Sequence, residues 1–77
     1  MSESLKLINN FEIAQRIKKL IDEKGYTKAE IARKLRISPT SVYKWLEAES
    51  IPDVQHLLDL SEMLGVTIDY IVKGGDD

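Results

Sequence analysis

The sequence has 77 residues, enough for one small domain, and it contains no cysteine, which excludes disulfide bonds and thiolate metal sites. No apolar run approaches the roughly 18 residues that a membrane span needs. The first residues also lack the basic-then-apolar pattern of a signal peptide. We therefore expect a cytoplasmic protein without contact to a membrane.

The net charge is −2, but basic and acidic side chains are segregated along the chain. Residues 16–44 carry nine basic and three acidic side chains, whereas residues 45–77 carry one basic and eight acidic ones. Ordinary solvated helix faces would explain this pattern. A basic surface that meets a polyanion would explain it equally, so overall acidity does not decide against nucleic acid as a partner.

The hydrophobic periodicity predicts five helices and no strand, which is an all-α fold. The first helix is expected over residues 11–23 and ends at Gly25, which is placed as a left-handed cap. Its buried stripe consists of Ile13, Ile17, Leu20 and Ile21. Residues 1–10 form either an N-terminal arm or an extension of this helix, which would use the apolar side chains Leu5, Leu7 and Ile8.

The second helix begins at a capping box, because Thr27 is a good N-cap and Glu30 stands three residues later. Its inner face consists of Ile31, Ala32 and Leu35. A short turn, Arg36 and Ile37, then leads to the next helix.

The third helix is expected over residues 39–47, with Ser38 as N-cap and Pro39 at the first helical position. At about 100° per residue, its polar residues share one arc and its apolar residues the other. The outward arc of about 140° holds Pro39, Thr40, Tyr43, Lys44 and Glu47. The inward arc holds Ser41, Val42, Trp45 and Leu46, so Trp45 is expected in the core rather than as a stacking platform.

The last part of the chain predicts two more helices. Pro52 interrupts the chain and Asp53 caps a fourth helix, which ends at Gly65 and buries Leu57, Leu60 and Leu64. Thr67 caps a short fifth helix that runs through Val72. The apolar side chains of this helix belong to the core or to a dimer patch, and they are Ile68, Tyr70, Ile71 and Val72.

The spacing of small and apolar residues in the second and third helices predicts a helix-turn-helix. Counted from Lys28, a small residue stands at the fifth position and apolar residues stand at the tenth, fifteenth and eighteenth. These are Ala32, Ile37, Val42 and Trp45. A small residue at the crossing lets the helices meet at a steep angle, and the third helix then projects toward a groove about 12 Å wide.

These residues resemble the Xre/Cro-type helix-turn-helix family, to which the lambda-like phage repressors and Cro proteins belong. The similar segments are residues 26–35, Ile37-Ser38, residues 42–45, Pro52 and residues 64–72. The resemblance implies a five-helix lambda-repressor-like domain over residues 11–73, whose helix-turn-helix is formed by the second and third helices. Residues 74–77 are then a flexible tail, which is either a natural terminus or the start of a linker.

The resemblance also assigns roles to residues. Pro39, Thr40 and Lys44 match base-reading positions, and Lys44 is able to donate to guanine O6 or N7. Lys28, Ser38 and Tyr43 match positions that contact the DNA backbone or the groove edge. Lys28 stands at a helix N-terminus, where both its ammonium and the helix dipole favour an anion.

Three features depart from the family pattern. Arg36 stands in the turn where glycine is usual, at a cost of about 1 kcal/mol if its backbone is left-handed. Ile21 and Leu46 replace a buried Arg–Glu pair of some members by an apolar contact. The loop after the third helix carries the carboxylates of Glu47, Glu49 and Asp53, which would repel phosphates unless they turn away. No phosphate contact is therefore assigned to this loop.

The function expected from these features is sequence-specific binding of double-stranded DNA by a phage or prophage repressor or Cro-like regulator. Such a regulator would bind a pseudo-palindromic operator as a weak or DNA-assisted homodimer through the fourth and fifth helices. The alternative is a protein-interaction module on the same fold, such as an antitoxin or an antirepressor partner. No catalytic residue, cofactor, metal or small-molecule substrate is expected, and His56 is interpreted as a surface histidine.

Overall fold

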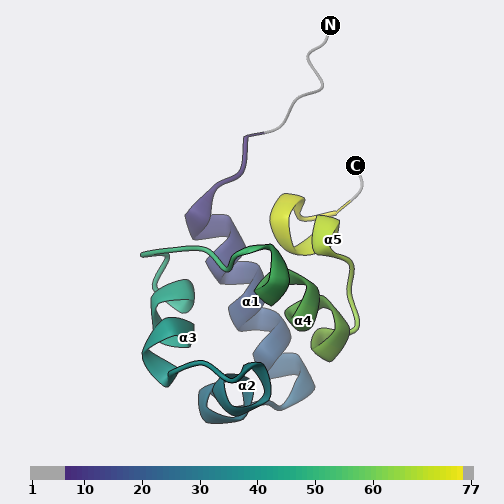
Figure 1. The fold of residues 1–77 in the computed structure, drawn as a ribbon. Helices are drawn as coiled ribbons and strands as arrows, with labels where there is room; N and C mark the ends of the chain where they lie inside the picture. The colour runs from purple at the N-terminus through teal and green to yellow at the C-terminus, as the bar shows by residue number, and fades with distance from the viewer. Residues whose placement is uncertain (1–6, 76–77) are drawn as a thin grey trace, which may run out of the picture.

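The computed structural model describes residues 7–75, and within this range the chain forms five helices and no strand (Figure 1). They are α1 (Asn10–Lys24), α2 (Lys28–Leu35), α3 (Pro39–Leu46), α4 (Val54–Leu64) and α5 (Ile68–Lys73). The all-α class and the order of the helices are confirmed. The bounds of α1, α3 and α5 differ by a single residue from those expected, and α3 ends at Leu46 rather than at residue 47.

All five helices begin at a side chain that accepts a hydrogen bond from the backbone N–H three residues later, which satisfies one of the free N–H groups of the first turn. These N-cap residues are Asn9, Thr27, Ser38, Asp53 and Thr67. At Thr27 the expected capping box is complete, since the backbone N–H of Thr27 donates in return to Glu30 Oε1 over 2.7 Å. Sequence-encoded caps thus account for the start of every helix.

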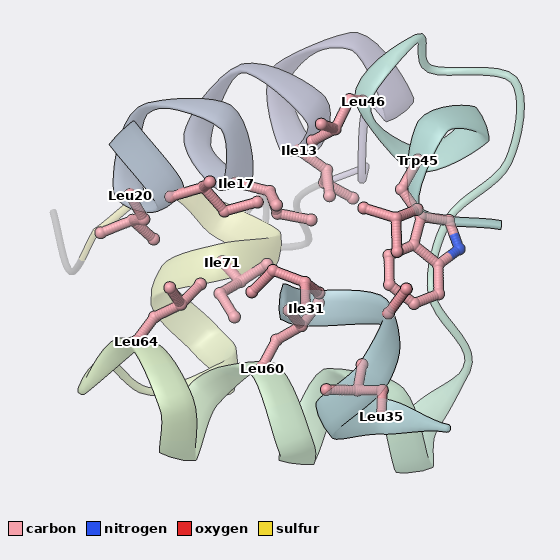
Figure 2. Close-up of a cluster of buried hydrophobic side chains, with 13 residues drawn as sticks. Ile13, Ile17, Leu20, Ile31, Leu35, Trp45, Leu46, Leu60, Leu64 and Ile71 are labelled. Atoms are coloured by element: carbon pink, nitrogen blue, oxygen red, sulfur yellow. The ribbon is translucent and has the colours of Figure 1, made fainter. Parts of the chain in front are cut away.

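The core surrounds α1, which packs against α3, α4 and α5, while α2 packs against α3. In Figure 1, α3 lies on one side of α1 and α4 and α5 lie on the other. The side chains that fill the centre come from all five helices (Figure 2) and include Ile17, Ile31, Val42, Leu60, Leu64 and Ile71, each fully buried. Leu57 differs from the expectation. Leu60 and Leu64, the other leucines predicted to be buried in α4, are buried, whereas Leu57 is only half-buried.

The segment before α1 is extended rather than helical. Leu7 and Ile8 lie outside α1 and are 89% and 50% exposed, and Asn9 caps the helix that begins at Asn10. The alternative of a longer first helix is therefore wrong for residues 7–9. Leu5 and the rest of residues 1–6 lie outside the described residues, as do residues 76 and 77 of the expected tail.

No helix within residues 7–75 has both the length and the apolar composition that crossing a membrane requires.

Candidate nucleic-acid interface

The turn between α2 and α3 holds the two helices at a defined angle. Arg36 adopts left-handed backbone angles (φ 60°, ψ 44°) and its N–H donates to the carbonyl of Arg33. The N–H of Ile37 donates to the carbonyl of Ala32 over 3.0 Å. These paired bonds form the Schellman turn that usually needs glycine at its left-handed position. The strain expected for Arg36 is therefore present.

Helix α3 presents one apolar and one polar face, as expected. Val42, Trp45 and Leu46 are at most 6% exposed, and Figure 2 shows Trp45 and Leu46 directed into the core. The expected role of Trp45 in the core is confirmed. The residues of the opposite face, Pro39, Thr40, Tyr43 and Lys44, are all exposed. Helix α3 is thus attached to the body through one face and offers the other to a partner.

The structure brings all six expected DNA-contacting residues to the exposed surface of α2 and α3. Pro39, Thr40 and Lys44 lie on the first two turns of α3, and Ser38 precedes them as its cap. The Ser38 hydroxyl oxygen accepts from the Ser41 N–H over 3.3 Å, so one of its acceptor positions is already used.

Lys28 and Tyr43 meet across the two helices. The Nζ atom of Lys28, at the start of α2, lies 5.4 Å from the centroid of the Tyr43 ring, within the range of a cation–π contact. The linear sequence did not indicate this contact, since the two residues belong to different helices. Their approach depends on the crossing angle of α2 and α3.

An open groove of about 360 Å³ lies beside Lys28, between α1, the turn before α2 and the end of α3. Its apolar lining includes Ile21 and Leu46, both buried, as expected for the apolar replacement of an ion pair. Its charged lining consists of Lys18, Lys28, Asp22 and Glu47. Lys18 was not singled out from the sequence, although its place within the basic segment 16–44 was a signal.

The three carboxylates after α3 have different surroundings. Asp53 Oδ1 accepts from the backbone N–H of His56 over 2.9 Å and lies 3.0 Å from His56 Nδ1. Asp53 is therefore engaged at the start of α4, although its side chain, like those of Glu47 and Glu49, is exposed. Repulsion of a polyanion would be reduced most at Asp53, because its carboxylate faces the positive N-terminal end of α4.

His56 is half-buried rather than a free surface residue, which corrects the expectation from the sequence. Its ring lies 5.4 Å from that of Trp45, with the planes tilted by 47°. Asp53 and the first turn of α4 hold the His56 ring beside the indole of Trp45, which lies on the buried face of α3. Among residues 7–75, no group of three or more histidine, aspartate or glutamate side chains is arranged to hold a metal ion.

Comparison with known proteins gives a family match over most of the chain. The model of a family described as "Helix-turn-helix" matches residues 17–71. A curated relative is the SPbeta prophage-derived uncharacterized HTH-type transcriptional regulator YonR of Bacillus subtilis, which is 35% identical over 60 residues. This match covers 78% of the present chain and 56% of YonR. The chain spans between 21% and 56% of the length of the curated relatives it matches.

Solved structures share the arrangement of helices. The P22 c2 repressor protein, in complex with a synthetic operator, superposes with a TM-score of 0.77 at 25% identity, over 82% of this chain and 96% of the repressor chain. SinR, a master regulator for biofilm formation, was solved in complex with DNA and superposes with a TM-score of 0.70 at 30% identity. That match covers 77% of this chain and 95% of the SinR chain. The five-helix order is therefore that of lambda-repressor-like domains.

Proposed function

This chain belongs to the helix-turn-helix family, and from that membership we propose that it is a transcription regulator that binds double-stranded DNA by laying α3 in the major groove. The observation that carries the proposal is the division of α3 into two faces. Three buried side chains hold it to the body, while a hydroxyl, a phenol and an ammonium project outward from Thr40, Tyr43 and Lys44. All three are able to hydrogen-bond to base edges or phosphates.

We assign base reading to Pro39, Thr40 and Lys44, and contacts to the backbone or groove edge to Lys28, Ser38 and Tyr43. The support for this division is position: the first group lies on the N-terminal two turns of α3, and Lys28 begins α2, where free backbone N–H groups favour a phosphate. The similarity to prophage-derived YonR and to the P22 c2 repressor supports a phage or prophage regulator. We further propose that it acts in the cytoplasm, where its operator would lie.

The regulator would bind a pseudo-palindromic operator as a weak or DNA-assisted homodimer through α4 and α5. The two large apolar side chains exposed on α4 support this surface, since Val54 is 78% and Leu58 41% exposed, four residues apart on one helix face. On α5, by contrast, Ile71 is fully buried and Tyr70 and Val72 pack against the core. These exposures support a contribution of α4 to the proposed dimer surface more than one of α5.

Selection of duplexes from a random pool with the purified protein tests the function directly. We expect enrichment of a motif with two inverted half-sites about one helical turn apart. Affinity for the selected duplex should fall with rising salt by about 0.9 logarithmic units per unit of log salt for each phosphate neutralised. Failure to bind any duplex at low salt would instead favour the protein-interaction module, for which the exposed Glu47 and Glu49 beside α3 are the supporting observation.

Sedimentation of the protein, free and on the selected duplex, tests the dimer. We expect two protein molecules per duplex, and we expect Leu58→Glu to reduce this stoichiometry to one. Phe11→Glu is the matched control, because Phe11 is likewise an exposed apolar residue, 62% exposed, but lies on α1. A single copy of the unaltered protein on a palindromic duplex would contradict dimerisation.

A further inference from the structure

A lysine and an aromatic ring from different helices meet on the surface that would face DNA. Lys28 is the first residue of α2 and Tyr43 lies in the middle of α3, with Nζ 5.4 Å from the ring centroid. Both side chains are exposed, Tyr43 by 49%. Because both side chains are exposed, the core of the domain does not depend on this contact. Its effect therefore concerns what binds at this surface.

The groove beside Lys28 contains carboxylates that compete with the Tyr43 ring for the Lys28 ammonium. Asp22 and Glu47 line the same groove, and either carboxylate is able to attract an ammonium that moves freely on its four-carbon stem. A carboxylate would cancel the positive charge that a phosphate needs. The face of an aromatic ring attracts the ammonium as well, but it carries no net charge and leaves that of the lysine intact.

We propose that Tyr43 is a positioning residue, whose ring holds the Lys28 ammonium at the N-terminus of α2 with its charge available to a DNA phosphate. This inference rests on the proposed function and refines the role of Tyr43 within it. The ring face acts through Lys28, separately from any contact that the phenolic hydroxyl makes to the DNA backbone or groove edge. Holding the lysine in place before binding also reduces the side-chain entropy that is lost when DNA binds.

The test compares variants of the full chain for binding to the duplex selected above, by fluorescence anisotropy at several salt concentrations. Tyr43→Phe keeps the ring and removes the hydroxyl, while Tyr43→Leu removes the ring. We expect Tyr43→Leu to bind about two- to fivefold more weakly than Tyr43→Phe, the range that an exposed cation–π contact spans. Thermal unfolding of both variants checks that the fold persists.

The coupling to Lys28 is measured with a double-mutant cycle. We expect Tyr43→Leu to bind no more weakly than Tyr43→Phe once Lys28→Ala is present, because the ring then has no ammonium to hold. Lys24→Ala is the matched charge control: the Lys24 ammonium lies near Gly65 at the end of α4, so the loss caused by Tyr43→Leu should persist in this background.

Two outcomes would overturn the inference while leaving the proposed function intact. In the first, Tyr43→Phe weakens binding as much as Tyr43→Leu, which would mean that the hydroxyl accounts for the whole contribution of Tyr43 and the ring for none of it. In the second, Tyr43→Leu binds more weakly than Tyr43→Phe by the same factor with and without Lys28→Ala, which would mean that the residues act independently. If the unaltered protein binds no duplex, the proposed function and this inference fall together.

Discussion

The guanidinium of Arg16 in α1 lies directly against Gly74, the C-cap residue that follows α5. Its Nε donates to the carbonyl of Ile71 over 2.8 Å and its Nη2 to that of Val72 over 2.7 Å. A Cβ added at Gly74 would come 2.5 Å from Arg16 Nη1, so the guanidinium occupies the space that glycine leaves open. A side chain from the first helix thereby satisfies backbone acceptors at the end of the last helix, where no intrahelical donor remains.

Arg16→Met should therefore destabilise the domain although it replaces a charged residue by an apolar one of similar length. Loss of charge-assisted hydrogen bonds in a half-buried position should lower the free energy of unfolding by roughly 2 kcal/mol. For a chain of this size, that corresponds to a fall of roughly 8–16 °C in the melting temperature. Arg33→Met is the control, because Arg33 is exposed on α2. Equal effects of the two substitutions would show that the bonds to α5 do not stabilise the fold.

Ala48→Gly should stabilise the protein. Ala48 has φ 63°, and the bonds from its N–H to Trp45 and from the Glu49 N–H to Lys44 form a second Schellman turn without glycine. Glycine avoids the left-handed strain but makes the unfolded chain more flexible. We therefore expect the free energy of unfolding, measured with denaturant, to rise by about 0.5–1 kcal/mol. Ala29→Gly should instead lower the free energy of unfolding, because Ala29 is exposed within α2 and glycine is a poorer helix former than alanine. A loss of stability with Ala48→Gly would contradict strain at this turn.

Lys44→Ala and Lys28→Ala should weaken DNA binding in different ways. If Lys44 reads a base, its loss should relax sequence preference at one position of each half-site by about 1–3 kcal/mol. If Lys28 contacts a phosphate, its loss should weaken binding to all duplexes alike and reduce the salt slope by about 1. Repeating the duplex selection with each variant measures the first effect, and salt titrations measure the second. An unchanged motif for Lys44→Ala would remove this residue from the base-reading set.

Glu47→Gln should strengthen DNA binding, because Glu47 is an exposed carboxylate at the end of α3 and lines the groove beside Lys28. We expect a gain of about two- to fivefold at low salt, which disappears as salt screens the repulsion. Asp53→Asn is the matched control: it removes the same charge from the same loop, but Asp53 is engaged at the start of α4. Asparagine is an equally good cap, so stability should change little. Equal gains for both variants would indicate a long-range effect of net charge rather than a local one.

Local features of the sequence were sufficient to predict the helices and their order. Caps such as Thr27 and Asp53 and the apolar periodicity of each segment act within a few residues, so they are visible without tertiary structure. The exact end of α3 was not visible. It depends on the left-handed conformation of Ala48, a residue type that does not signal such a turn.

The two-sided character of α3 was likewise determined by the sequence alone, because helical geometry converts the positions of Val42 and Trp45 directly into a buried face. Only the tertiary structure decided which side chains meet across helices. The contacts of Lys28 with Tyr43, of His56 with Trp45 and of Arg16 with the end of α5 join residues between 11 and 56 positions apart. Such contacts depend on the angles at which helices cross, and those angles result from the packing of the whole core rather than from any local segment.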